Sequence, residues 1–169
     1  MSVANKALTS YLLPYQHVWI RDKRKKKASL KARQIGFTHA TGLEVLLHAL
    51  KHPRHTCFCV SVTQTAAIRQ MVQEVRFWIE VLKKDPVYEP HLRLTKDAQG
   101  EIHLPNGSKI IAVAHEPARL RGYTKSSYWF DEAGWWPKRI LDGIMESVLP
   151  QVDTGRNPDG VIRWLSTPG

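Results

Sequence analysis

The sequence is poor in cysteine, in acidic residues and in long hydrophobic runs. Of its 169 residues only two are cysteine, Cys57 and Cys59. A disulfide between residues two apart would be strained, and a Cys-x-Cys pair without a second pair is poor spacing for zinc. We therefore expect both thiols to face the same side of a buried strand.

No hydrophobic run approaches the roughly 18 residues that a membrane-spanning helix needs. The polar start, Met1 to Asn5, lacks the apolar segment of a signal peptide. We therefore expect no membrane partner and a cytoplasmic location.

Acidic residues are outnumbered by basic ones, 15 against 25, which gives a formal net charge of +10 and a pI near 9.8. A globular domain this basic usually meets phosphate, either on nucleic acid or on an anionic membrane surface. The densest basic run, Arg21 to Lys27, could contact DNA phosphates or form a solvated loop at the edge of a sheet.

The length fits one domain with a real core, and strand and helix patterns alternate along it. Helical spacing predicts helices over 38–51, 63–84 and after Pro137, and a short helix or turn over 12–20. Alternating or apolar segments predict strands over 28–30, 56–62, 92–95, 101–104, 109–114, 128–130 and 161–165. The strands over 92–114, separated by turn signals at 99–100 and 106–107, predict a β-meander inserted into the sheet. A Pro/Gly/Asp-rich loop is expected over 150–160. The alternation predicts a parallel α/β sheet.

The strand at 128–130 delivers two adjacent carboxylates, Asp131 and Glu132. Like charges side by side repel, so the arrangement gains mainly if a cation or a reacting water lies opposite. In a nucleoside triphosphatase of the P-loop type, the first acid holds Mg²⁺ and the second orients the attacking water. The alternative is a helix N-terminus, where acidic side chains favour the positive end of the dipole.

The loop between the first expected strand and the next helix matches the phosphate-binding pattern G-x-x-x-x-G-K-[ST] only in part. Gly36 takes the second glycine and Thr38 the hydroxyl residue, whereas Lys31 replaces the first glycine and Phe37 the lysine. Lys31 and Arg33 still supply cations within the loop. The alternative is a strand–helix junction with incidental basic residues.

Four segments in order, 13–19, 31–38, 121–133 and 165–168, carry a family resemblance. Together they resemble the ATPase domain of phage terminase large subunits, which are DNA-packaging motors, and most of all those of Mu-like phages and prophages. The resemblance spans about residues 12–169. It implies a three-layer P-loop NTPase fold of the ASCE/RecA-like kind, with a mostly parallel central sheet.

The resemblance also implies roles for matching residues. Gln16 would read the adenine edge, Thr38 and Asp131 would hold Mg²⁺, and Glu132 would be the catalytic glutamate that polarises water. Gly36 and the loop amides would hold the β- and γ-phosphates. The implied nucleotide-binding set is Gln16, Lys31, Arg33, Gln34, Ile35, Gly36, Phe37 and Thr38.

Two further elements follow from the same resemblance. Arg121 resembles an arginine finger that completes a neighbouring subunit's site, although a solvent-facing loop cation is the alternative. Ser166, Thr167 and Pro168 resemble the coupling motif that senses hydrolysis.

The partners implied are ATP with Mg²⁺, double-stranded DNA, other large subunits in a ring, the portal and the small terminase subunit. Trp135 and Trp136 could stack on bases, but a core or subunit-interface role fits better, because the motor grips duplex backbone.

Family members continue with further sheet strands and an RNase H-type nuclease domain. Nothing in residues 1–169 matches that nuclease, so we expect a fragment that holds one ATPase domain: a truncated chain, a split gene or a prophage remnant. The rival functions are a non-catalytic remnant that binds DNA or another terminase chain, which Phe37 in place of lysine favours, and another P-loop nucleic-acid motor such as a helicase lobe.

Overall fold

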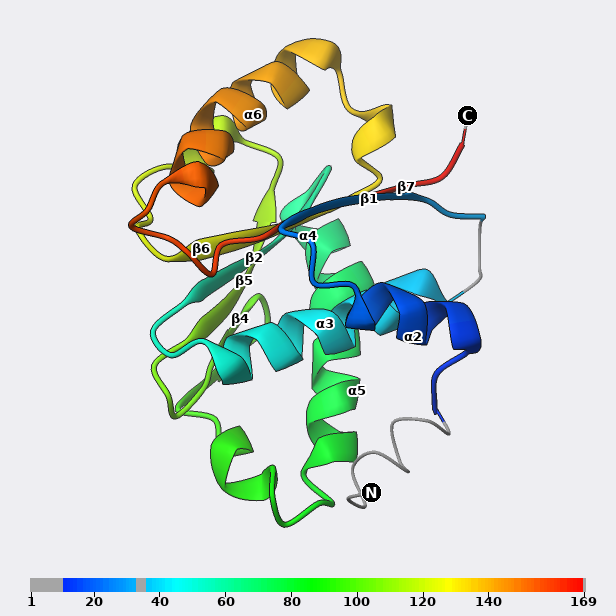
Figure 1. The fold of residues 1–169 in the computed structure, drawn as a ribbon, viewed down its shortest axis with the longest axis vertical. Coiled ribbons are helices and arrows are strands. Elements are labelled where there is room, and N and C mark those ends of the chain that lie inside the picture. The colour runs from blue at the N-terminus through cyan, green and yellow to red at the C-terminus, as the bar shows by residue number, and fades with distance from the viewer. Residues whose placement is uncertain (1–10, 33–35, 169) are drawn as a thin grey trace.

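The computed structural model describes residues 11–32 and 36–168, which form a seven-stranded sheet between two helical layers (Figure 1). The strands are β1 (Lys26–Leu30), β2 (Thr56–Ser61), β3 (Lys96–Ala98), β4 (Glu101–His103), β5 (Lys109–Ala114), β6 (Ser126–Asp131) and β7 (Ile162–Ser166). Their order across the sheet is β1-β7-β6-β2-β5-β4-β3. All neighbours from β1 to β5 are parallel, and β5-β4-β3 are antiparallel. The predicted mostly parallel, three-layer α/β fold is confirmed.

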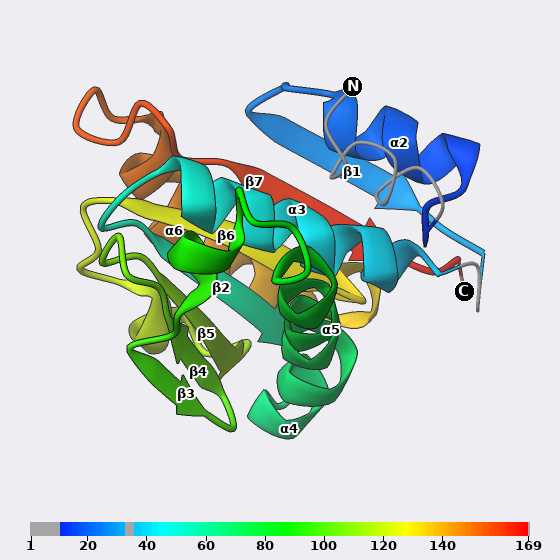
Figure 2. The ribbon, with the colours of Figure 1, turned by 90° about the horizontal axis from the view of Figure 1, so that it is seen from below.

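One face of the sheet carries most of the helices. They are α2 (Pro14–Arg21), α3 (Phe37–Lys51), α4 (Gln64–Ala67), a π-helical turn η1 (Ile68–Val72) and α5 (Gln73–Leu82). The other face carries α6 (Lys138–Asp153) with the short 3-10 turns η3 (Pro117–Leu120) and η4 (Ala133–Trp135), while η2 (Glu89–Leu92) leads into β3. Figure 2 shows α2 beside β1 at one edge of the sheet and the β3–β4 hairpin at the other.

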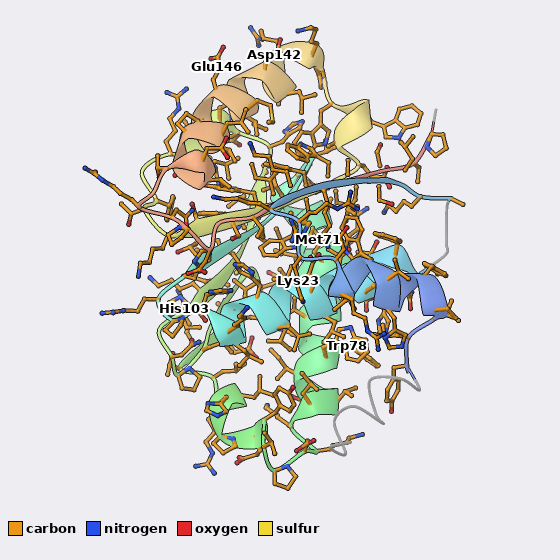
Figure 3. All side chains as sticks on the ribbon, in the orientation of Figure 1. Lys23, Met71, Trp78, His103, Asp142 and Glu146 are labelled. Atoms are coloured by element: carbon orange, nitrogen blue, oxygen red, sulfur yellow. The ribbon has the colours of Figure 1, made fainter. Side chains whose placement is uncertain are left out.

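Each face has its own hydrophobic core, as a sheet between two helical layers requires. Met71 and Trp78 are fully buried in the core under α3 and α5, whereas Asp142 and Glu146 project from α6 away from the sheet (Figure 3). Cys57 and Cys59 lie in the α3/α5 core with no exposed surface, as predicted for a buried strand. No helix in the described part of the chain is long and apolar enough to cross a membrane.

The predicted meander is confirmed, because β3, β4 and β5 follow one another in the chain and pair antiparallel, but the predicted position of its first strand is wrong. Residues 92–95 are not a strand. The hairpin turn at 99–100 pairs Ala98 with Glu101 and Lys96 with His103, so the first strand of the hairpin is Lys96–Ala98. The buried side chain of Leu92 instead ends η2. The third strand, β5, pairs parallel with β2, so the β3–β4 hairpin extends the sheet at its edge.

The helix α6 continues to Asp153, through Pro150, where a loop over 150–160 was predicted. Pro150 is exposed in the last turn. Beyond it Val152 is buried, and the Gln151 amide donates to the carbonyls of Leu120 and Ser147, both at 2.7 Å. These contacts hold the last turn despite the missing proline N–H.

The helix predicted over 63–84 is capped by Thr63, whose hydroxyl accepts from the Ala66 N–H at 3.1 Å. Its interior is interrupted by the π turn at Ile68–Val72, which apolar spacing alone did not indicate. Such turns are rare and recur at functional sites.

A buried carboxylate on α3 joins four neighbouring elements. The Oε1 of Glu44 accepts from Lys27 Nζ at 2.9 Å and from Arg163 Nε at 2.7 Å. Its Oε2 accepts from the indole N–H groups of Trp19 at 2.9 Å and Trp129 at 3.2 Å. Burial lowers the pKa of Lys27, and Glu44 opposes that shift. One side chain of α3 thus fixes α2, β1, β6 and β7 against each other.

Replacing Glu44 with glutamine keeps the size of the side chain but leaves two buried cations without a counter-charge. We expect Glu44→Gln to lower the free energy of unfolding by about 3–5 kcal/mol in urea denaturation. The matched control is Glu80→Gln, which removes an exposed ion pair with Lys83 and should change stability by less than about 0.5 kcal/mol. Equal losses in the two variants would contradict the role assigned to Glu44.

Candidate functional site

The carboxyl ends of three neighbouring parallel strands meet at one edge of the sheet. There β1 ends at Leu30, β7 at Ser166 and β6 at Asp131. The Lys31 N–H donates to the Ser166 carbonyl at 2.8 Å, which continues the β1–β7 pairing one residue further. In open α/β sheets this edge is where ligands bind.

The side chain of Lys31 lies between oxygen atoms from two other segments. Its Nζ is 3.0 Å from Asp131 Oδ1, 3.3 Å from Glu132 Oε1 and 3.4 Å from Thr38 Oγ1. Lys31 is only 8% exposed, so these contacts are made out of bulk water. The structure therefore brings together the phosphate-loop and acidic residues that the sequence placed 100 positions apart.

The two acids differ in their surroundings. Asp131 is buried, and burial raises its pKa, although the Lys31 ammonium works against this shift. Burial also acts to raise the pKa of Glu132, but hydrogen bonds from Thr167 together with Lys31 outweigh it and hold that pKa below its ordinary value. Glu132 therefore stays ionised near neutral pH.

Glu132 adopts a left-handed backbone conformation, with φ of 56° and ψ of 33°. A non-glycine residue rarely takes this conformation, and such strain recurs at active sites. It turns the chain sharply between β6 and η4, so that the carboxylate points back toward β7.

Both carboxylate oxygens of Glu132 are engaged. Oε1 faces Lys31, while Oε2 accepts from the Thr167 backbone N–H at 3.0 Å and from its hydroxyl at 2.9 Å. The adjoining backbone is tied to β7 by a bond of 3.2 Å from the Gly134 N–H to Ser166 Oγ. A Cβ on Gly134 would lie 2.5 Å from that hydroxyl, so any larger residue here would displace the Ser166 side chain and break this bond.

The phosphate loop ends at Gly36, which has a φ of 71° and precedes α3. The next side chain, Phe37, stands where the common pattern has lysine. It is 7% exposed and packs against Trp19, with ring centroids 4.9 Å apart, and in a cluster with Leu165. Any contact of Phe37 with phosphate must therefore use its backbone. The predicted loop residues Arg33, Gln34 and Ile35 lie outside the described part of the chain.

The amide of Gln16 is engaged with backbone on both sides. Its Oε1 accepts from the Leu13 N–H at 2.8 Å, and its Nε2 donates to the Gly36 carbonyl at 2.7 Å. Gln16 is 3% exposed. The structure thus ties α2 to the end of the phosphate loop, and the predicted contact with adenine stays a prediction.

Arg121 lies apart from this cluster. It is exposed in the loop after η3, and its Nε donates to Ser147 Oγ on α6 at 3.0 Å. The structure thus places Arg121 on the α6 side of the sheet. An exposed position is compatible with a role toward another subunit.

The donor atoms around Lys31 Nζ suit a hard divalent cation. They are carboxylate and hydroxyl oxygens, and the ammonium group already occupies a position between them as a bound cation would. Residues 11–32 and 36–168 hold no cluster of three histidine, cysteine or acidic side chains that could bind a metal. A site with few protein ligands is typical of Mg²⁺, which usually keeps several waters and binds together with substrate phosphates.

One contact of this site was not anticipated from the sequence. The indole Nε1–H of Trp135 donates to Thr167 Oγ1 at 3.1 Å. The expectation for the tryptophan pair was a core or interface role, which Trp136 fulfils, since it is 6% exposed and packs against Phe130. No spacing rule reveals the Trp135 contact, because it depends on the sharp turn at Glu132.

The chain has the three-layer α/β fold of the P-loop type, and the site lies at the carboxyl edge of its parallel strands. Residues 29–142 match the family model described as terminase large subunit, T4likevirus-type, N-terminal. The chain belongs to this family. The resemblance to terminase large subunits is confirmed, and the finer expectation of a Mu-like type stays a prediction.

Solved structures of phage terminases share the fold. The chain is similar to the large terminase ATPase domain of Thermus phage P74-26, with a TM-score of 0.71 and 19% identity over 97% of this chain and 68% of that one. It is also similar to the large terminase of a second thermophilic bacteriophage, with a TM-score of 0.66 and 12% identity over 93% of this chain. For the HK97 bacteriophage large terminase the TM-score is 0.62 and the identity 16% over 92% of this chain.

The chain spans 38% of the second thermophilic phage's terminase and 33% of the HK97 terminase. Comparison with curated protein sequences gave no match.

Removing the Lys31 ammonium should open the acidic edge to a metal ion even without nucleotide. We expect Lys31→Met to bind Mn²⁺, used as a probe, at least about tenfold more tightly than the unaltered protein. A tenfold gain in affinity corresponds to about 1.4 kcal/mol, and the loss of charge repulsion between Lys31 and the metal ion should supply at least that much. Electron paramagnetic resonance titration of free Mn²⁺ measures this directly. The control is Lys138→Met, which removes an exposed partner of Asp142 and should leave Mn²⁺ binding unchanged. Equal Mn²⁺ affinity in Lys31→Met and the unaltered protein would count against a cation site here.

Proposed function

We propose that residues 1–169 form the ATP-hydrolysing motor domain of a phage terminase large subunit, which drives double-stranded DNA into a prohead. The observation that carries the proposal is the position of Lys31 Nζ, a cation held at once by Asp131, Glu132 and Thr38. Membership of the terminase family supports it. The bacterial host's cytoplasm is the expected location.

Each residue of the edge then has a role that fits its surroundings. Thr38 and Asp131 would hold Mg²⁺, which when bound with ATP neutralises charge developing on the transferred phosphoryl group. The Lys31 ammonium would move from the acids to the phosphates, which restores the cation that Phe37 does not supply. Gly36 and the adjoining amides at the start of α3 would cradle phosphate oxygens.

Glu132 would accept a hydrogen bond from the attacking water and orient it. Departure of Lys31 toward phosphate frees Oε1 for that water, while Thr167 keeps Oε2 in place. Because Thr167 follows directly on β7, any displacement of the carboxylate would be transmitted to the segment 166–168. That is the physical basis for proposing Ser166, Thr167 and Pro168 as the coupling motif.

Two other positions would act from outside this cluster. Gln16 would hold the end of the phosphate loop through the Gly36 carbonyl. The remaining hydrogen-bonding capacity of its amide would serve the adenine edge. Arg121 would reach the site of a neighbouring subunit in a ring. The +10 charge supports binding to DNA backbone, and the portal and small subunit are the further partners we propose.

Steady-state phosphate release at rising ATP and protein concentration, with duplex DNA present, tests the proposed activity. We expect turnover in the unaltered protein and a loss of about 10²–10⁴-fold in Glu132→Ala, because the water is no longer oriented. The matched control is Glu146→Ala, an exposed position on α6, which should keep full turnover. Tight ATP binding with no turnover under any of these conditions would favour a non-catalytic remnant.

Mixing variants tests whether the finger acts between subunits. We expect Arg121→Ala to lower turnover by about 10³–10⁵-fold. The neighbouring Arg119→Ala, which breaks only a surface pair with Glu116, should leave it close to normal.

Because Arg121→Ala retains Glu132 and Glu132→Ala retains Arg121, mixing the two inactive proteins should recover turnover. A mixture as inactive as its components, formed under conditions where the unaltered protein assembles, would contradict action in trans.

A further inference from the structure

We propose that Trp135 is a positioning residue for Glu132 and acts through Thr167, an inference that rests on the proposed function of this site. The three side chains form a continuous hydrogen-bonded chain from the protein surface to the acidic edge. Trp135 Nε1 lies 3.1 Å from Thr167 Oγ1, which lies 2.9 Å from Glu132 Oε2.

The chemistry of the three groups fixes the direction of this chain. An indole N–H can only donate, and an ionised carboxylate can only accept. The hydroxyl of Thr167 has one hydrogen, so it accepts a hydrogen bond from Trp135 and donates one to Glu132. Without the indole, the hydroxyl could rotate toward other acceptors, and the carboxylate would keep only the backbone N–H of Thr167 on that oxygen.

The backbone places Trp135 for this role. The left-handed turn at Glu132 is closed by a hydrogen bond of 3.1 Å from the Trp135 N–H to the Glu132 carbonyl. That turn carries the indole across to the segment that follows β7. Trp135 therefore contacts Thr167, which in turn binds the carboxylate of Glu132, the residue at the start of the turn.

Burial does not explain the position of the Trp135 ring, because 51% of the residue is exposed. Its neighbour Trp136 shows the opposite combination, since it is 6% exposed and its Nε1 has no hydrogen-bond partner in the described structure. The two adjacent tryptophans thus divide into one that packs and one that donates. This contrast supplies a matched control for the experiment.

The test is a double-mutant cycle on turnover, with Trp135→Phe, Thr167→Val and the double variant. We expect Trp135→Phe to lower kcat by about two- to tenfold, the range for one neutral hydrogen bond, with the KM for ATP unchanged. Thr167→Val removes a hydrogen bond to a charged carboxylate and should lower kcat by about ten- to 150-fold. The double variant should be no worse than Thr167→Val alone, because Trp135 acts through that hydroxyl. Thr167→Ser keeps the hydroxyl and should restore most of kcat.

Trp136→Phe is the control and should keep kcat, even if it lowers stability. Multiplicative losses in the double variant, or an equal loss in Trp136→Phe, would overturn the proposal in favour of a packing role for Trp135.

A second measurement does not depend on turnover and separates the failure of this inference from the failure of the ATPase proposal. The indole N–H resonance of Trp135, assigned by its absence in Trp135→Phe, is followed in nitrogen–proton NMR spectra. We expect it to shift in both Thr167→Val and Glu132→Ala while the Trp136 resonance stays in place. Absence of turnover in the unaltered protein would contradict the ATPase proposal alone. A Trp135 resonance that does not shift in either variant would contradict the role proposed for Trp135.

Discussion

The Glu44 carboxylate is the interaction on which the geometry of this protein depends. It binds Lys27 on β1, Arg163 on β7 and the indoles of Trp19 on α2 and Trp129 on β6. The same strands carry Lys31, Thr167 and Asp131 at or just beyond their carboxyl ends. A single buried charge in the middle of α3 therefore sets the relative height and spacing of the strands whose tips form the acidic edge. The cost of burying it is offset by four donors, and such networks are sensitive to the loss of any member.

Much of the fold could be predicted from the sequence because its elements follow simple rules. The apolar β2 and β6 runs, the stop after α3 and the alternation of strands with helices left little choice of fold class. The pairing of Lys31 with Asp131 could also be predicted, because both lie at the carboxyl ends of parallel strands and such ends meet at one edge. The family resemblance added the expectation of their roles.

Other features depend on contacts that no local pattern records. Strand β3 begins at Lys96 because the hairpin turn sets the register, although the alternating residues 92–95 look more like a strand. Helix α6 continues past Pro150 because Gln151 donates to the Leu120 carbonyl and Val152 is buried in the core. Glu44 gave a faint signal, a charge between Leu43 and Val45, but its partners lie far apart in the chain. The turn at Glu132 and its link to Trp135 arise only once β6 and β7 are neighbours.

The burial of Phe37 has a consequence for how such proteins are found. At this position the helix start is anchored in apolar packing with Trp19 and Leu165, and the positive charge has moved back along the chain to the tip of β1. Phe37 packs the loop and Lys31 neutralises the acidic edge, so a substitution at one position need not disturb the role of the other. Pattern searches that demand lysine before the hydroxyl residue will overlook chains of this kind, whereas a search for any cation that shares an edge with an Asp-Glu pair will retain them.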